Sequence, residues 1–361
     1  MDKNFGWCLK MALLSRIIDI PLFLEIGENC LENLTSILSS NSLSFRKAVV
    51  LFDRTTYQIA GKRIYYLLGR MKTCIDRICV EECTIEFTEI VRERIRESGC
   101  DVVFGVGGGK VLDTGKYAAA LERINFISVP TCPSNDGIAS PVAVIEKNGR
   151  KKSLGAKMPL GIIADLGIIK ASPLRNIRAG IGDLISNLSA VEDWKLASRK
   201  RAEKFDNFAA LLSVNASEAL LNIGGPNILD FNFLRKLVEG LVMGGIAMGI
   251  AGSSRPCSGA EHKFSHGLDA ILAGPTLHGE QVAIGTIVAT YLRGGDYKKI
   301  VSFLKVTGVP VNSRQLGVPE EKMVEALVYA PKTRPERFTI LEDIKIDEKM
   351  ARDALIKTGV I

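Results

Sequence analysis

All three histidines of the chain lie within seventeen residues, in the stretch SGAEHKFSHGLDAILAGPTLHGEQ (258–281). His262 and His266 stand four residues apart on a predicted helix and therefore share one face. His278 follows a predicted Gly-Pro break at 274–275 and begins the next helix. Two helices that meet at a tight turn bring their imidazoles together, so this clustering favours a metal site over three unrelated histidines.

A catalytic metal centre usually has three protein ligands and an open position for the substrate. No cysteine accompanies the histidines at ligand spacing, which argues against a structural zinc knot. Asp183, in RAGIGDLISN, is the best candidate for a carboxylate ligand. It is an acid in an apolar stretch of small residues, where an unpaired charge is costly. From the residues alone, a metal ligand and a helix N-cap are equally good interpretations of Asp183.

The segment DVVFGVGGGKVLDTGK (101–116) places Gly107, Gly108 and Gly109 between a predicted strand and a predicted helix. Glycines let the backbone approach an anion, and the helix N-terminus offers free N–H groups and the positive end of a dipole. A pyrophosphate fits this arrangement, and a tight turn is the alternative. The segment differs from G-x-G-x-x-G, and it lacks the G-K-S/T ending of a P-loop.

Two further polar positions follow apolar strands. Asp53 ends KAVVLFD, where a carboxylate binds the ribose of a dinucleotide or caps the next helix. The loop VPTCPSNDGIASP (129–141) follows another strand, and polar loops there lie at the mouth of a parallel sheet, where ligands bind. Its polar residues are Thr131, Ser134, Asn135, Asp136 and Ser140, around Gly137.

The elements that must position these groups follow two patterns. Up to residue 170, apolar strands alternate with helices, which predicts a parallel sheet covered on both faces. The predicted strands are 21–27, 47–53, 76–82, 101–106, 125–131 and 161–169, with a hairpin at 140–155 and helices at 28–40, 56–70, 88–98 and 107–122.

After Pro173 the pattern is helical, with predicted helices at 174–200, 203–222, 231–252, 258–273 and 279–293, and shorter ones near 297, 320 and 348. We therefore expect an α/β domain over 1–170 and an all-helical domain over 171–361.

Composition excludes several classes of function. The 47 basic and 40 acidic residues are scattered, which argues against a nucleic-acid patch but suits small anions. The longest uncharged run, 240–254, is too short for a membrane span. No signal peptide and no Cys-x-x-Cys pair is evident, so we expect a cytoplasmic protein with reduced cysteines. The first dozen residues, with Trp7 and Cys8, match no motif.

Five motifs, taken in their order along the chain, resemble those of the iron-containing alcohol dehydrogenase and dehydroquinate synthase-like superfamily. They are VGGGKVLDTGK, VPTCPSNDGIASP, GIGDLISN, SGAEHKFSH and LHGEQ. With Asp53, these motifs span 53–281, and they are most similar to those of the sn-glycerol-1-phosphate dehydrogenases, which make the archaeal lipid backbone. The resemblance implies a Rossmann-like domain, a helical metal-binding domain and NAD(P) between them. It implies NAD(P)H-dependent reduction of dihydroxyacetone phosphate to sn-glycerol 1-phosphate by a homo-oligomer.

The resemblance also assigns residues. One divalent metal ion, usually zinc in this branch, would be held by Asp183, His262 and His278. His266 then falls to substrate contact, although from spacing alone it is an alternative ligand. The cofactor would contact Asp53, Gly107, Gly108, Gly109, Lys110, Asp113, Thr131, Ser134 and Ser140. Protonation of the product is expected from Asp136 or His266. Preference between NADH and NADPH stays open, because Asp53 repels a 2′-phosphate whereas Arg54 accepts one.

Three alternatives remain. Dehydroquinate synthases share the H-x-x-x-H and HGE patterns, but their metal carboxylate is a glutamate followed three residues later by lysine. Here these positions are Asp183 and Ser186, and Ser140-Pro141-Val142 replaces a Gly-Gly-Lys. Glycerol dehydrogenases share the metal arrangement but differ in the loop and histidine segments. A non-enzymatic metal or nucleotide-binding module would need neither an open metal position nor two loops facing one cleft.

Overall fold

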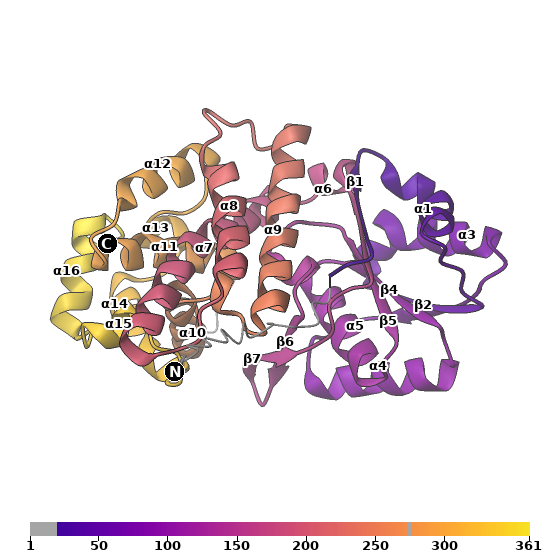
Figure 1. Ribbon diagram of the computed structural model, residues 1–361, viewed down its shortest axis with the longest axis horizontal. Coiled ribbons are helices and arrows are strands. Elements are labelled where there is room, and N and C mark those ends of the chain that lie inside the picture. The colour runs from indigo at the N-terminus through magenta and orange to yellow at the C-terminus, as the bar shows by residue number, and fades with distance from the viewer. Residues whose placement is uncertain (1–19, 273–275) are drawn as a thin grey trace, which may run out of the picture.

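The computed structural model describes residues 20–272 and 276–361, and it divides into a sheet half and a helical half that lie side by side (Figure 1). The first dozen residues and the predicted Gly-Pro break at 274–275 lie outside the described residues. The sheet contains six parallel strands in the order β1-β8-β5-β4-β2-β3. They are β1 (Phe23–Gly27), β2 (Lys47–Phe52), β3 (Cys74–Cys79), β4 (Val102–Gly107), β5 (Asn125–Pro130) and β8 (Gly161–Asp165).

Helices cover both faces of the sheet, because alternate residues of each central strand face opposite layers. Val49 and Leu51 of β2 join one core cluster, whereas Val50 and Phe52 join the other. The helices of this half are α1 (Leu34–Ser40), α2 (Arg54–Thr56), α3 (Lys62–Arg70), α4 (Ile85–Ser98), α5 (Gly109–Leu121) and α6 (Leu166–Lys170).

Strand order determines where a ligand binds in this sheet. The chain passes from β2 outward to β3 and then returns to β4 on the other side of β2. In an open parallel sheet such a reversal leaves a crevice at the carboxyl ends of the two strands. Asp53 follows β2 and the glycine loop follows β4, so both flank this crevice. This position differs from the first β–α turn of a typical Rossmann domain.

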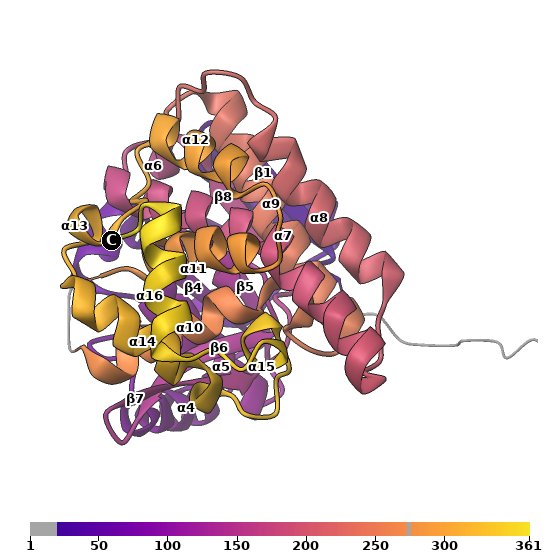
Figure 2. The same cartoon turned by 90° about the vertical axis from the view of Figure 1, so that its left-hand side faces the viewer.

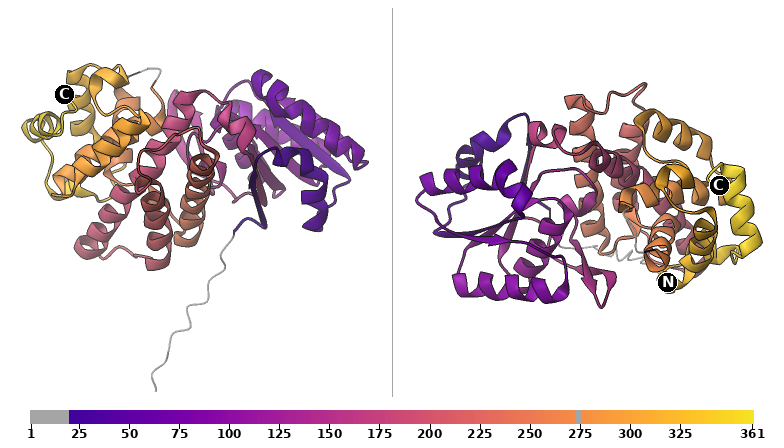
Figure 3. Two further views of the ribbon diagram at one scale, coloured as in Figure 1. Left: turned by 90° about the horizontal axis from the view of Figure 1, so that it is seen from above. Right: turned by 180° about the vertical axis from the view of Figure 1, so that it is seen from behind.

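An excursion separates β5 from β8, although these two strands pair directly. It contains a short 3₁₀ turn at Asp136–Ile138 and an antiparallel hairpin, β6 (Val142–Lys147) and β7 (Arg150–Gly155). The hairpin lies outside the six-stranded sheet and reaches toward the helical half (Figure 3). It therefore places polar side chains between the two halves.

The helical half consists of ten helices among the described residues, packed around one another (Figure 2). They are α7 (Leu174–Arg201), α8 (Asn207–Leu221), α9 (Phe231–Ala251), α10 (Ala260–Ile271), α11 (His278–Leu292), α12 (Tyr297–Thr307), α13 (Ser313–Leu316), α14 (Glu320–Thr333), α15 (Ile340–Asp343) and α16 (Glu348–Thr358). Within the described ranges, no helix is long and apolar enough to cross a membrane.

The predicted fold class is confirmed: a parallel-sheet domain precedes a helical one. The strand predicted over 161–169 is too long, because Asp165 ends β8 and caps α6 through the N–H groups of Gly167 and Ile168. The short helices α13 and α15 were not predicted. The domain limit at residue 170 stays a prediction, since one hydrophobic cluster continues from Val49 in the sheet to Leu355 in the helical half.

Candidate active site

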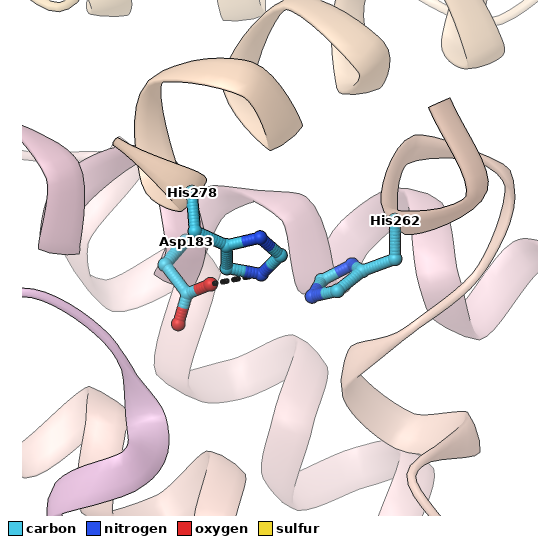
Figure 4. Close-up of side chains that lie close together, drawn as sticks. All are labelled: Asp183, His262 and His278. Atoms are coloured by element: carbon cyan, nitrogen blue, oxygen red, sulfur yellow. Dashed lines mark ion pairs between the residues drawn. The ribbon is translucent and has the colours of Figure 1, made fainter. Parts of the chain in front are cut away.

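Asp183, His262 and His278 converge from three helices of the helical half, α7, α10 and α11 (Figure 4). One possible ligand atom of each lies within 4.8 Å of the others. Asp183 Oδ1 is 3.7 Å from His278 Nε2. Asp183 lies inside α7 and Pro173 is the N-cap of that helix, so the N-cap interpretation of Asp183 is wrong. The His266 ring lies farther out, with its centroid 6.4 Å from that of His278.

Two glycines bring α7 and α11 into backbone contact beside these ligands. A Cβ atom at Gly182 would overlap the carbonyl oxygen of Gly279, and one at Gly279 would overlap that of Ala179. Each glycine is the chain neighbour of a candidate ligand, Asp183 or His278. The close approach of the two helices therefore sets the separation between the carboxylate and the imidazole.

Hydrogen bonds orient the His278 ring. The Gln281 amide nitrogen donates to Asp269 Oδ1 at 3.1 Å and to Thr276 Oγ1 at 2.9 Å, which leaves its oxygen as an acceptor. Ser265 Oγ donates to that oxygen at 2.5 Å, so it accepts from His278 Nδ1 at 2.9 Å. Nδ1 then carries the proton, and the Nε2 lone pair faces Asp183.

A carboxylate orients the ring of His262 in the same way. Glu261 Oε1 lies 3.0 Å from His262 Nδ1 and accepts a hydrogen bond from that nitrogen. The other oxygen of Glu261 accepts from Ser189 Oγ at 2.7 Å, and Arg293 donates to Ser189 at 2.6 Å. Nε2 of His262 is therefore the nitrogen available to a metal ion.

These residues fit a divalent cation. Burial, followed by the nearby Asp136 carboxylate, raises the pKa of Asp183 well above its usual value, and burial lowers the pKa of His278. A buried carboxylate beside two imidazoles is costly without a positive charge, and a cation at their centre would stabilise the ionised acid and the neutral rings. Two nitrogens and one carboxylate oxygen are a common donor set for zinc and iron.

A cleft of about 380 Å³ opens between the two halves and contains the three candidate ligands. Of the residues predicted to bind the cofactor, five line it: Gly109, Lys110, Asp113, Ser134 and Ser140. Asp136 and His266 line it too. The other four, Asp53, Gly107, Gly108 and Thr131, are not among its lining residues. Both predicted loops thus contribute residues to the cleft, and the cofactor contacts themselves stay a prediction.

The glycine loop presents an uncapped helix end. Gly108 is the N-cap of α5, has an extended backbone and offers no capping side chain, so the N–H groups of Gly109 and Lys110 at the start of the helix can face an anion. Asp53 is already engaged, because its Oδ1 accepts from the N–H groups of Thr55 and Thr56 at the start of α2. Asp53 Oδ2 lies 3.8 Å from Lys110 Nζ. The capping interpretation of Asp53 therefore holds, with one oxygen left toward the loop.

Sequence reasoning missed Lys116, which contacts the backbone of the polar loop 129–141. Its buried ammonium lies 3.4 Å from Asp113 Oδ1 and donates to the Gly137 carbonyl at 2.8 Å. The next residue of that loop toward the N-terminus, Asp136, donates its N–H to Asp183 Oδ2 at 2.9 Å. Burial raises the pKa of Asp136 to about 6. A lysine three residues after Asp113 in an apolar helix was the available signal.

Glu261, Ser265 and Gln281 were missed as well, although all three stand inside the histidine motif. Their spacing placed them near the histidines but did not say which side of each ring they would contact. In the structure Glu261 contacts a ring nitrogen of its neighbour His262 within α10, Ser265 contacts one of His278 across to α11, and Gln281 contacts Ser265.

Comparison with known proteins agrees with this geometry. A family model described as iron-containing alcohol dehydrogenase matches residues 25–173. Among solved structures, a glycerol dehydrogenase from Schizosaccharomyces pombe superposes with a TM-score of 0.79 at 23% identity, covering 95% of this chain and 90% of that one. A butanol dehydrogenase from Thermotoga maritima superposes with a TM-score of 0.68 at 17% identity, covering 96% and 99%. The fold is that of the iron-containing alcohol dehydrogenases.

Relatives with higher identity define the family within that class. A glycerol-1-phosphate dehydrogenase [NAD(P)+] from Thermococcus sibiricus is 39% identical over 352 residues, which are 97% of this chain and 100% of that protein. One from Pyrococcus furiosus is 41% identical over 347 residues, 96% of this chain and 99% of that protein. The chain belongs to the glycerol-1-phosphate dehydrogenase family.

Proposed function

We propose that this protein catalyses the NAD(P)H-dependent reduction of dihydroxyacetone phosphate to sn-glycerol 1-phosphate. The relatives at about 40% identity carry this activity in their names. The observation that carries the proposal is that Asp183, His262 and His278 share one cleft with the start of α5. We therefore assign the metal centre and the site for the cofactor pyrophosphate to this one cleft.

In this proposal Asp183, His262 and His278 hold one zinc ion, and the loops after β4 and β5 hold NAD(P)H. The ion would act as a Lewis acid on the substrate carbonyl, and the cofactor would supply the hydride. Ser265 and Glu261 keep the two rings in the required tautomer. The first turn of α5 contacts the pyrophosphate, and Ser134 and Ser140 contact the remainder of the cofactor from the second loop.

Asp136 is the proposed proton donor for the new hydroxyl group. It lines the cleft beside Asp183, and its raised pKa of about 6 keeps part of the population protonated near neutral pH. His266 also lines the cleft; burial and the nearby Arg334 lower its pKa to about 3, so the ring is neutral. We assign His266 to substrate contact.

An assay of cofactor oxidation tests the proposal. Purified protein with zinc should oxidise NADH or NADPH only when dihydroxyacetone phosphate is added, and the product should be the sn-1 enantiomer. Glycerol oxidation with NAD⁺ and conversion of the dehydroquinate synthase substrate are the comparison reactions for the two related activities. The proposal fails if dihydroxyacetone phosphate is not reduced while one of these substrates is turned over. Mass measurement in solution tests the expected homo-oligomer.

A further inference from the structure

A buried ionic cluster lies on the Nδ1 side of the His262 ring. Two acids belong to it, Asp193 on α7 and Glu261 on α10, and the side chains of both are fully buried. The guanidinium of Arg293, at the end of α11, is largely buried as well. Buried ion pairs rarely add net stability, because desolvation offsets their attraction. The cluster therefore needs an explanation other than stability.

Arg293 reaches the two acids by different routes. Its Nη1 pairs directly with Asp193 Oδ1 at 2.8 Å. Its Nη2 donates to Ser189 Oγ at 2.6 Å, and this hydroxyl donates in turn to Glu261 Oε2 at 2.7 Å. Ser189 and Asp193 are four residues apart on one face of α7, and the planar fork of a guanidinium contacts both at once. One arginine thus fixes the positions of two carboxylates.

Asp193 also holds the beginning of α10. Its Oδ2 accepts from the N–H of Ala260, the first residue of that helix, at 2.7 Å. Its Oδ1 accepts from the N–H of Ile340 at 2.9 Å. The N-cap of α10 is Gly259, which has no side chain, so a carboxylate from α7 supplies the cap. A Cβ atom at Gly259 would lie 2.7 Å from Asp193 Oδ2, so only glycine allows this approach.

The cluster joins the three helices that carry the candidate ligands. Its members come from α7, α10 and the end of α11, the helices of Asp183, His262 and His278. Glu261 Oε1 lies 3.0 Å from Nδ1 of His262, so the position of this carboxylate determines how the ring is turned. Arg293 is not among the residues that line the cleft, and it therefore acts on the ring through the groups that it holds.

We propose that Arg293 is a positioning residue for the metal centre. Acting through Ser189 and Glu261, it keeps the His262 ring turned with Nε2 toward the other two ligands. Asp193 and Glu261 repel each other, and without Arg293 no cation would offset this repulsion between two buried carboxylates. The inference rests on the metal centre of the proposed function, but on neither its substrate nor its cofactor.

The zinc affinity of Arg293→Met, measured by competition with a chelator, tests the inference. Methionine is a long apolar side chain that makes neither hydrogen bond. We expect zinc to bind about 10-fold more weakly than in wild type, the lower end of the loss that follows removal of a support for a metal ligand. Arg92→Met is the matched control, because it removes a guanidinium that pairs with Glu89 and Glu122 in the sheet half. Its zinc affinity should stay within about twofold of wild type.

Ser189→Ala separates positioning from stability, and it also serves if Arg293→Met does not fold. It removes the hydroxyl that connects the guanidinium to Glu261 but retains the ion pair with Asp193. Zinc affinity should fall by roughly 3- to 10-fold, as for loss of one hydrogen bond to a charged group. Thr358→Val is the control, because its buried hydroxyl bonds to carbonyls of its own helix, α16.

The double variant tests whether both changes act on one path. If Arg293 acts through Ser189, the double variant should bind zinc no more weakly than Arg293→Met alone. Equal zinc affinity in Arg293→Met and wild type, or additive losses in the double variant, overturns the inference. Wild-type protein that binds zinc but does not reduce dihydroxyacetone phosphate overturns the proposed function alone.

Cobalt substitution gives a readout that depends on neither activity nor stability. The visible absorption of Co²⁺ bound to the full-length protein reports the geometry of its ligands. This absorption should change in Arg293→Met and in Ser189→Ala, because the His262 ring turns, and it should stay the same in Arg92→Met and Thr358→Val. An unchanged cobalt spectrum in both test variants contradicts the positioning role.

Discussion

Among the described residues, Asp183 is the acid that groups with His262 and His278 at distances suited to a shared metal ion. Asp183→Asn keeps the shape of the side chain but removes its charge, so we expect loss of bound metal and of activity together. His262→Ala and His278→Ala should behave in the same way. Metal content of the purified variants is the measurement.

His266→Ala is the comparison for these three changes. It should retain its metal and raise the KM for dihydroxyacetone phosphate, because its ring lies outside the group of ligands. Full metal content and full activity in Asp183→Asn would show that the carboxylate has been wrongly assigned. Metal loss in His266→Ala would favour a ligand set that includes His266, which the sequence spacing alone permits.

Ser265 is placed to support a metal ion through His278, because its Oγ lies 2.9 Å from Nδ1 of that ring. Ser265→Ala leaves the Nδ1 proton of that ring without its acceptor, and loss of such a support typically weakens metal binding by about 10- to 100-fold. Competition with a chelator measures this affinity. Thr286→Val on α11 is the control, because that buried hydroxyl bonds only to the carbonyl of Val282 in its own helix. If the two variants bind metal equally well, the hydroxyl of Ser265 has no orienting role.

At the scale of elements, the crossing of α7 and α11 depends on residues without side chains. Gly182→Ala or Gly279→Ala would force the two backbones apart, and we expect the free energy of unfolding to fall by about 1–3 kcal/mol. Metal affinity should fall in the same variants, because Asp183 and His278 move apart with their helices. Urea denaturation and metal titration together test this.

Gly69→Ala on α3 is the matched control for these changes. A Cβ there has nothing within 4 Å, and alanine favours a helix, so stability should stay equal or rise. A stable Gly279→Ala protein with normal metal affinity would show that the helices tolerate a wider separation.

A substitution in the turn between β4 and α5 tests whether that turn contacts the cofactor. Gly108→Val should raise the KM for the nicotinamide cofactor at least tenfold, because a branched side chain covers the first-turn N–H groups that an anion must approach. Gly224→Val, exposed and with nothing within 4 Å of its Cβ, serves as the control. An unaffected KM in Gly108→Val means that the loop is only a turn.

At the scale of the whole molecule, the three candidate metal ligands belong to one half, since α7, α10 and α11 are all helices of the C-terminal part. A bound ion therefore cross-links helices that are distant in sequence and stabilises the folded chain by mass action. Chelation should lower the melting temperature of the wild-type protein by an amount on the order of 5 °C. Asp183→Asn should melt at the same temperature with and without chelator, and an identical shift in that variant would contradict the assignment.

Sequence patterns predicted the order and type of the long elements because apolar strands and amphipathic helices differ in period. The β5–β8 excursion was recognised as a loop and a hairpin, but its reach across to Asp269 and Arg334 depends on how the two halves dock. The grouping of Asp183 with His262 and His278 could be predicted because histidine is rare in this chain and an acid in an apolar helix is conspicuous. The residues that orient the rings could not, because the contacts of Glu261 and Ser265 with ring nitrogens depend on rotamers and helix packing that spacing does not specify.

The direct pairing of β5 with β8 has a further consequence, for evolution. The intervening residues 132–159 leave the sheet and return to it without pairing with its six strands. Insertions, deletions and replacements in the hairpin can therefore accumulate while cofactor-side strands and metal-bearing helices stay unchanged. Selection could in this way retain the hydride-transfer chemistry and exchange only the part that recognises the far end of the substrate. The excursion is thus a natural starting point for redesigning which ketone the scaffold accepts.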